Sequence, residues 1–381
     1  MQYGSIFTIK QAVNKKIIIK EKNMKKVLCT LIALTMIFAT AAGCGGGGGS
    51  GADLIGISMP TQSSERWIKD GNTMKDILEE RGFEVDLQFA EDDIPTQRTQ
   101  IEAMLAKGAK VLVIAAIDGS TLSSTLDAAA EDGVYIISYD RLLVDTAAVS
   151  YYATFDNVAV GRLQAQSLVD GVRERRGDPP YNIELFAGSP DDTNSFFFFK
   201  GAMEVLDPLI AAGEFTVVSG QDTQDAVGTL RWDGAVAQAR MDAILAAHYT
   251  DGKPLHGVLS PYDGLSRGII SALASFGFDH NDVANWPIVS GQDAEAASIK
   301  MIITGEQFST ILKDTRDLAR VAADMVEAVL EGREPEINDT ETYHNNVKIV
   351  PSYLLIPYTV DITNYQELVM DSGYLTADDI K

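Results

Sequence analysis

One stretch of the chain, residues 111–142, constrains the fold more than any other, because it reads as strand, turn, helix and strand. Val111–Ala116 is an uninterrupted apolar run, which is typical of a strand buried on both faces. Turn residues follow, and an apolar helical face then runs from Leu122 to Ala129. Val134–Tyr139 is a second apolar strand. The stretch therefore predicts a right-handed βαβ unit of a parallel sheet.

The same alternation of strand and helix patterns continues on both sides of this unit. Further strands are expected at Leu54–Met59, Phe83–Phe89, Val149–Phe155, Tyr181–Gly188, Phe215–Ser219, Gly257–Pro261, Pro287–Gly291 and Gln307–Leu312, and a polar surface loop at 173–180. Alternating strands and helices favour an α/β fold with parallel sheets. Because single cores stop growing near ~250–300 residues, a chain of this length is expected to form two doubly wound lobes.

Residues 1–43 have the features of an export signal. Met24 is a second candidate start beside Met1, and two lysines, the apolar run Val27–Ala42 and the ending Ala-Ala-Gly-Cys44 follow it. A basic region, an apolar region and small residues form a cleavable signal peptide, and this ending resembles the lipobox of bacterial lipoproteins. The apolar run is shorter than the ~20 residues that a membrane span needs. We therefore expect Cys44 to be the lipidated first residue of the mature chain, with residues 44–52 as a glycine-rich tether.

Charge and cysteine content exclude several classes of partner and site. The whole chain carries a net charge of −23, and because residues 1–43 contain seven Lys and one Glu, the remainder carries −29. Such an acidic surface repels nucleic acid and anionic lipid, so neither is an expected partner. The two cysteines are Cys29 and Cys44, which leaves none in the mature fold for a disulfide or a metal site.

The chain lacks the motifs of common enzymes. None of its histidines (His248, His256, His280 and His344) occurs in an HExxH, Ser-His-Asp or Cys-His setting, and no phosphate-binding glycine loop follows the first strand. We therefore expect no catalytic residue, no metal and no cofactor.

Polar and aromatic residues gather instead where predicted strands end and helices begin, the edge at which open α/β sheets bind ligands. Each has an ordinary explanation, such as a helix cap for Asp192 or a strand-end ion pair for Asp140 and Arg141. Seven such clusters on one edge favour a binding site. The candidate ligand-binding residues are Arg66, Trp67, Asp140, Arg141, Asp192, Asn194, Phe196, Arg231, Trp232, Tyr262, Asp263, Asp293 and Lys313.

This mixture of side chains suits a neutral polyol. Sugar hydroxyls both donate and accept hydrogen bonds, so carboxylates can accept from them while Arg, Lys and Asn donate. The apolar face of a pyranose packs on flat aromatic rings, here Trp67, Trp232 and one of the phenylalanines at 196–198. Because acidic and basic groups are mixed, a strongly charged ligand is not expected.

Several segments, in order along residues 54–380, resemble the multiple-monosaccharide receptors of bacterial ABC importers, which are close kin of the xylose-, ribose- and galactose-binding proteins. They include GISMPTQSSERWIKDG, SYDRL, ELFAGSPDDTN, GTLRWD, LSPYDGLSRGII and STILKDTRDLA. The resemblance implies the type I periplasmic binding protein fold, with two Rossmann-like lobes, three hinge strands and the sugar in the cleft. It implies crossings near residues 153–157, 312–314 and 345–350. The expected N-terminal lobe is then 53–155 with 314–345, and the C-terminal lobe 156–313 with 346–381.

The resemblance also implies roles for single residues. Arg66 matches the sugar-binding arginine of the first loop, and Asp140 with Arg141 matches the pair that binds ring and hydroxyl oxygens. The other matches are Asp192 and Asn194 with the polar pair at a helix start, Trp232 with the stacking tryptophan, Asp293 with the strand-end aspartate and Lys313 with the hinge-side polar ligand. Tyr262-Asp263 departs from the family's Asn-Asp, which leaves open which of the two contacts the ligand.

The predicted function is that of an extracytoplasmic, lipid-anchored solute-binding protein. It would bind a monosaccharide such as glucose, galactose, xylose or arabinose as a monomer and deliver it to an ABC permease. A sensor subunit that presents the closed form to a membrane kinase or chemoreceptor is an alternative, and a sugar-active enzyme with paired carboxylates is another. A sugar-responsive repressor shares the fold, but the charge of −29 and the lack of an N-terminal helix-turn-helix argue against it. The sequence does not distinguish the sugars.

Overall fold

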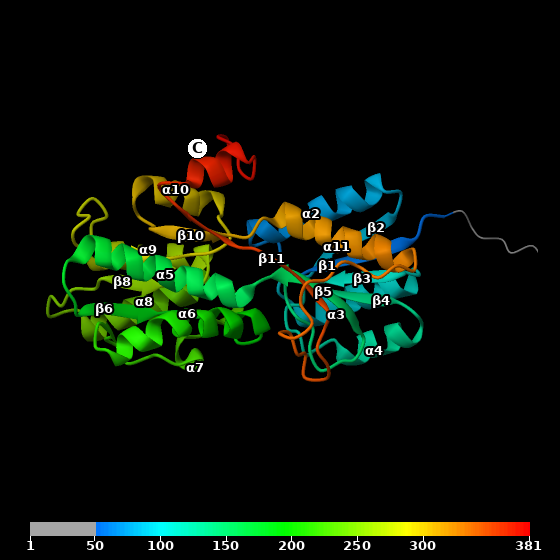
Figure 1. Cartoon of the computed structure of the whole chain (residues 1–381), viewed down its shortest axis with the longest axis horizontal. Coiled ribbons are helices and arrows are strands. Elements are labelled where there is room, and N and C mark those ends of the chain that lie inside the picture. Colours follow the sequence, from blue (N-terminus) through cyan, green and yellow to red (C-terminus); the bar gives the residue numbers. More distant parts are fainter. Residues whose placement is uncertain (1–50) are drawn as a thin grey trace, which may run out of the picture. The chain divides into compact units, whose positions relative to one another are not determined.

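The computed structural model describes residues 51–381, in which Ala52–Lys381 fold as two α/β lobes (Figure 1). The predicted signal peptide, Cys44 and most of the tether lie outside these residues. Within residues 51–381, every helix is too short or too polar to cross a bilayer.

The first lobe is built on a six-stranded sheet in which every pair of neighbours is parallel, in the order β11-β5-β4-β3-β1-β2. Its strands are β1 (Leu54–Met59), β2 (Glu84–Phe89), β3 (Val111–Ile114), β4 (Tyr135–Tyr139), β5 (Val149–Phe155) and β11 (Ser352–Leu355). Its helices are α2 (Glu65–Glu80), α3 (Ile94–Ala106), α4 (Ser123–Glu131) and α11 (Thr315–Leu330). Helices α2 and α11 lie side by side on one face of the sheet (Figure 1).

The second lobe contains a parallel sheet in the order β7-β6-β8-β9 and an antiparallel pair, β10 with β12. Its strands are β6 (Tyr181–Leu185), β7 (Phe215–Val217), β8 (Gly257–Leu259), β9 (Ile288–Val289), β10 (Ser309–Leu312) and β12 (Tyr358–Asp361). Its helical elements are α5 (Asn157–Arg176), α6 (Thr193–Ala211), α7 (Gln224–Val227), η1 (Leu230–Trp232), α8 (Gly234–His248), α9 (Asp263–Phe276), α10 (Ala296–Thr304) and η2 (Gln366–Asp371).

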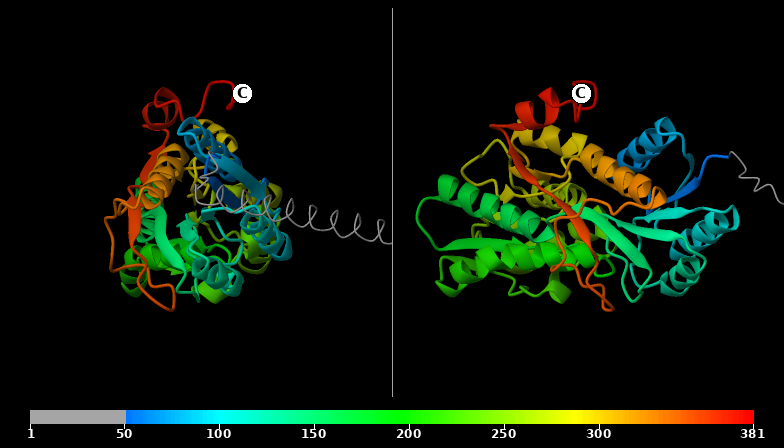
Figure 2. Two further views of the ribbon diagram at one scale, coloured as in Figure 1. Left: turned by 90° about the vertical axis from the view of Figure 1, so that its right-hand side faces the viewer. Right: turned by 45° about the vertical axis from the view of Figure 1, so that its right-hand side comes forward.

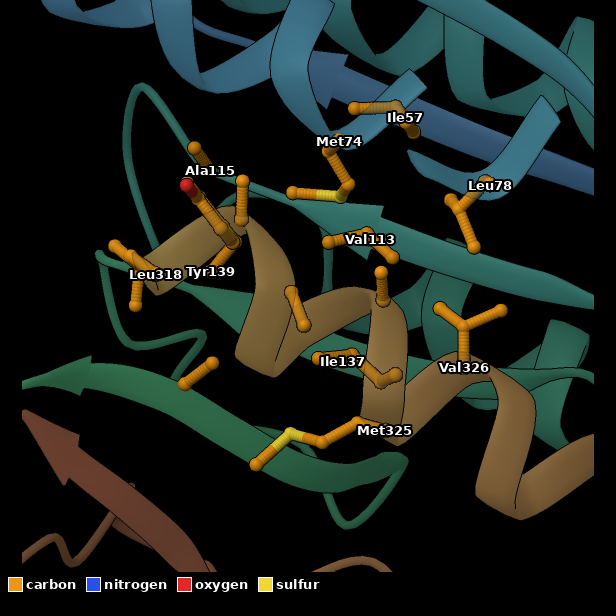
Figure 3. Close-up of a cluster of buried hydrophobic side chains, with 14 of the residues drawn as sticks. Ile57, Met74, Leu78, Val113, Ala115, Ile137, Tyr139, Leu318, Met325 and Val326 are labelled. Carbon is orange, nitrogen blue, oxygen red and sulfur yellow. The ribbon is translucent and has the colours of Figure 1, made fainter. Parts of the chain in front are cut away.

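The apolar strand residues explain why helices cover both faces of the first sheet. Successive side chains of a strand point to opposite faces, so an uninterrupted run such as β3 buries both. Val113 contributes to the cluster formed with α2 and α11, whereas Leu112 and Ile114 belong to the cluster formed with α3 and α4. Figure 3 shows Met74 of α2 and Val326 of α11 among the strand residues of the first cluster.

The chain passes between the lobes three times, and the third passage corrects the sequence prediction. The first two passages lie between β5 and α5 and between β10 and α11. Strand β11 pairs with β5 in the first sheet, with Ser352 opposite Tyr152, so residues 346–355 belong to the first lobe. The third passage is therefore at Ile356–Pro357 and not near 345–350. The segment that forms β11 is apolar, and an apolar pattern does not indicate which of the two sheets a strand joins.

The C-terminal segment then continues into the second lobe. Figure 2 shows it running from β11 to the red helical turn beside α10. Strand β12 pairs with β10, and Val369 and Tyr374 pack with Ile299 of α10. Neither β11, β12 nor η2 was predicted from the sequence.

The predicted loop at 173–180 is also partly wrong, because α5 continues to Arg176. Three arginines of this last turn, at 173, 175 and 176, lie at the negative end of the helix dipole, where cations are stabilising. Gly177, with a φ of 67°, ends the helix.

Helices α5 and α6 approach so closely that glycine is required on both. A Cβ at Gly161 of α5 would lie 1.9 Å from the carbonyl oxygen of Phe198, and one at Gly201 of α6 would lie 2.0 Å from that of Val158. This backbone contact places α6, and with it Phe198, against α5.

We expect Gly161→Ala to lower the free energy of unfolding by about 1–3 kcal/mol, because the added methyl group forces the two helices apart. On an open helix face the same change would be stabilising. Urea unfolding followed by circular dichroism measures the effect, with Gln166→Ala on the exposed face of α5 as control. A Gly161→Ala protein as stable as the wild type would contradict the close approach.

Candidate functional site

A cavity lies between the lobes, at the carboxyl ends of the strands. Eleven of the thirteen predicted residues line it: Arg66, Trp67, Asp140, Arg141, Asp192, Asn194, Arg231, Trp232, Tyr262, Asp293 and Lys313. Phe198, one of the phenylalanines expected at 196–198, also lines it, as do five residues that the sequence did not point to as ligand-binding: Thr61, Ser63, Ser64, Asp92 and Gln292.

Phe196 does not line the cavity, and Phe198 takes its place. Phe196 is 46% exposed, whereas Phe198 is buried and packs edge-on against Trp232, with ring centroids 6.2 Å apart. Residues two apart on a helix point to nearly opposite sides, since each residue turns the helix by about 100°. Four consecutive phenylalanines do not reveal which of them faces the ligand. The start of α6 at the Asp192 cap decides it.

Asp263 also lies outside the cavity, directly behind its wall. Its side chain is fully buried and accepts hydrogen bonds from the Glu295 N–H, Gln307 Nε2 and Thr310 Oγ1, each at 2.9 Å. Of the Tyr262-Asp263 pair, Tyr262 therefore faces the cavity and Asp263 supports the segment that carries Glu295.

The centre of the site is the guanidinium of Arg66, which is buried among three carboxylates. Its Nε lies 3.0 Å from Asp70, its Nη2 2.9 Å from Asp140 and its Nη1 3.5 Å from Asp293. Lys313 Nζ lies 3.2 Å from Asp293 and 3.6 Å from Asp140. Asp70 and Asp140 belong to the first lobe and Asp293 to the second, so Arg66 bridges the lobes.

These cations decide the charge state of the carboxylates. Burial by itself would raise the pKa of Asp140, but Arg66, Lys313 and Arg141 outweigh it and hold that pKa below its usual value. Burial raises the pKa of Asp70 to about 6, with Arg66 acting in the opposite direction. The cavity wall thus carries ionised Asp140 beside three cations.

A second ion pair, Arg141 with Asp192, spans the lobes at 3.0 Å. Asp192 also accepts from Trp232 Nε1 at 3.2 Å and caps α6 through the Asn194 N–H at 2.9 Å. Asp192 therefore caps α6, as its helix-cap explanation predicts, and also lines the cavity. Trp67 lies between two cations, with its ring centroid 4.3 Å from the Arg66 guanidinium and 5.0 Å from that of Arg141.

Asn194 supports the site through the backbone. Its Nδ2 donates to the Asp140 carbonyl at 2.7 Å, and its Oδ1 accepts from Tyr152 and Asn157. Asp140 has a φ of 56°, a left-handed conformation that is unfavourable for residues with a Cβ. Bonds from Asn194, Thr154 and Tyr152 to its carbonyl oxygen stabilise this turn. Asp293, Arg231 and Trp232 also have positive φ, so strained backbone gathers at the cavity.

Five buried charged atoms of the lining residues have only ion-pair partners within the described part of the chain. They are Arg66 Nη2, Asp140 Oδ2, Arg141 Nε, Arg231 Nη1 and Asp293 Oδ1. Buried polar atoms are nearly always hydrogen-bonded in native proteins. Three donors and two acceptors around one cavity match a ligand that both donates and accepts, as hydroxyl groups do. No cluster of His, Cys, Asp or Glu within residues 51–381 is arranged to hold a metal ion.

Of the residues that the sequence reasoning missed, Asp70 carried a usable signal. It follows Arg66 by four residues, so the two lie on one helix face and form an i,i+4 pair. Glu295 and Asp92 carried no such signal, because their neighbours in space are distant in sequence.

We expect Asp263→Asn to flatten the pH dependence of stability between about pH 6 and pH 8. Burial, with a further contribution from the Glu295 charge, raises the pKa of Asp263 to about 8. The folded state therefore holds a proton that the unfolded chain has lost, and stability falls as pH rises from about 4 to about 8. Between about pH 6 and pH 8, the free energy of unfolding of the wild type should fall by roughly 2 kcal/mol more than that of the variant. Urea titrations at each pH measure it, with exposed Asp242→Asn as control; equal slopes in all three proteins would contradict the protonated Asp263.

Comparison with known proteins places the chain in a family. A model of the periplasmic binding protein domain matches residues 55–334. The multiple sugar-binding periplasmic receptor ChvE of Rhizobium radiobacter is 56% identical over 327 residues, which are 86% of this chain and 92% of that protein. The multiple sugar-binding periplasmic protein SbpA of Azospirillum brasilense is 54% identical over 322 residues, 84% of this chain and 89% of its own length.

A solved structure is similar over the same region. An ABC transporter solute-binding protein from Clostridium phytofermentans with bound β-D-glucose has a TM-score of 0.82 and 44% identity, and the match covers 86% of this chain and all of that one. The resemblance and the α/β fold predicted from the sequence are thus confirmed. So is the prediction that the protein is not an enzyme, since these relatives are binding receptors. The chain belongs to the periplasmic binding protein family.

Proposed function

We propose that the protein is an extracytoplasmic receptor that captures a monosaccharide between its two lobes and delivers it to an ABC permease. The observation that carries this proposal is the set of five buried charged atoms, three donors and two acceptors, around one cavity. The names of the relatives and the glucose bound to the similar structure support a sugar as the ligand.

The charge and shape of the cavity wall favour a neutral ring. Four cations, Arg66, Arg141, Arg231 and Lys313, are each paired with an aspartate, so the wall offers hydrogen bonds without a large excess of either charge. Trp232 makes edge-on contacts with Phe198 and with Tyr262, and together these rings form an apolar wall. A pyranose presents hydroxyls around its edge and C–H groups on its faces, which such a site complements.

Binding and closure are linked through the contacts that cross the cleft. Arg66 with Asp293, Arg141 with Asp192 and Asn194 with Asp140 each join the lobes. A ligand favours the closed form only as far as it binds that form better. A sugar that fills the hydrogen-bonding capacity of both lobes would do so, and the closed monomer would be the form presented to the permease.

We expect the mature protein to bind at least one of glucose, galactose, xylose and arabinose in calorimetric titrations. Arg141→Ala and Trp232→Ala should each weaken binding at least tenfold, which is about 1.4 kcal/mol, because the first removes a buried donor and the second an apolar wall. Arg98→Ala and Tyr135→Ala, exposed residues outside the cavity, serve as controls. The absence of binding to any monosaccharide, or unchanged affinity in both cavity variants, would refute the proposal.

The anchor is a further part of the proposal, and it depends on the sequence Ala-Ala-Gly-Cys44. We expect Cys44→Ala to abolish incorporation of labelled palmitate and to release the protein from the membrane fraction, because the thiol is the site of lipid attachment. Cys29→Ala, within the predicted signal peptide, should leave labelling of the mature protein intact. Equal labelling of the Cys44→Ala variant and the wild type would rule out the anchor.

A further inference from the structure

At the rim of the cavity, the starts of two helices from opposite lobes meet through their cap residues. Ser64 precedes α2 in the first lobe, and Glu295 precedes α10 in the second. An N-cap side chain ordinarily accepts a hydrogen bond from its own helix, but neither of these does. Ser64 Oγ instead donates to Glu295 Oε1 at 3.0 Å.

The carboxylate of Glu295 is otherwise fixed within the second lobe. Tyr262 OH donates to Oε1 at 2.7 Å, and Arg267 Nη1 lies 2.6 Å from Oε2. The backbone N–H of Glu295 donates to the buried Asp263 carboxyl. Glu295 is only 4% exposed, and Ser64 is its hydrogen-bond partner from the first lobe.

The same carboxylate sets the orientation of a cavity residue. Tyr262 lines the cavity, and its ring stands edge-on to Trp232 with centroids 6.1 Å apart. Because its hydroxyl donates to Glu295, Tyr262 presents its ring to the cavity, with its O–H directed to the wall. The Glu295 carboxylate therefore accepts hydrogen bonds both from Tyr262, which lines the cavity, and from Ser64 of the opposite lobe.

We propose that Glu295 is a positioning residue of the binding cycle, which holds the Tyr262 ring against the ligand and accepts the Ser64 hydroxyl only when the lobes are closed. This inference depends on the proposed sugar-binding function and adds two residues to it. Opening of the cleft must break the Ser64–Glu295 hydrogen bond and return the Ser64 hydroxyl to water. Since the bond forms after the ligand has entered, it slows dissociation and leaves association unchanged.

The test is stopped-flow kinetics of the full-length mature protein with glucose and xylose, or with whichever monosaccharide of the panel binds. We expect Ser64→Ala to raise the dissociation rate about three- to tenfold with an unchanged association rate. Ser64→Thr, which keeps the hydroxyl, should restore slow dissociation. Ser124→Ala, in the first turn of α4 and exposed, is the matched control.

A second pair of variants tests the shared carboxylate. Tyr262→Phe keeps the ring and removes the hydroxyl that Glu295 orients, and it should also speed dissociation. Because both hydroxyls bind the same Oε1 atom, the effect of the double variant with Ser64→Ala should differ from the product of the two single effects. Purely additive effects would show that the two contacts act separately and would refute the role of Glu295.

The outcomes separate this inference from the function on which it depends. Wild-type dissociation in Ser64→Ala would overturn the inference while leaving sugar binding intact. So would faster dissociation that Ser64→Thr fails to restore, or that comes with an equal loss of stability without sugar, since that pattern is a helix-capping effect. A wild-type protein that binds no monosaccharide would overturn both.

Discussion

The buried guanidinium of Arg66 is the interaction on which the rest of the site depends. A buried charge is tolerated only when it is paired and hydrogen-bonded, and here three carboxylates meet that need. Asp70 comes from the same helix, Asp140 from the end of β4 and Asp293 from the opposite lobe. The contact between the lobes therefore completes the pairing of Arg66. Arg66 and its partners Asp140 and Asp293 thus form part of the cavity and also join the two lobes.

The apolar strands make this arrangement possible, because they leave only one edge for polar chemistry. Where both faces of a sheet are covered by helices, as in the first lobe, side chains that need water or a ligand gather at the strand ends. Asp140 follows β4 directly, and Lys313 follows β10. The positive φ of Asp140 shows how sharply the chain must turn there, and hydrogen bonds from Asn194 and Thr154 stabilise that turn.

Several polar residues near the cavity serve by positioning others. Asn194 uses its amide to hold the backbone of Asp140, and Asp263 uses its carboxyl to hold the segment of Glu295. Asp192 caps a helix and also pairs with Arg141. These double roles account for the number of charged residues that are buried around the cavity. We therefore expect a substitution of a supporting residue such as Asp263 to alter the positions of the residues that line the cavity.

The sequence alone predicts the α/β fold, the succession of most strands along the chain and the edge at which the polar clusters lie, because these follow from local periodicity and from the residues that end strands. It also predicted eleven of the residues that line the cavity. That Phe198 and not Phe196 faces the cavity became known from the fold, because helix register depends on where α6 begins. The pairing of β11 with β5 and the contact of Ser64 with Glu295 were likewise beyond the sequence. Both join residues about 200 or more positions apart, and no local pattern records which distant partner a strand or a side chain meets.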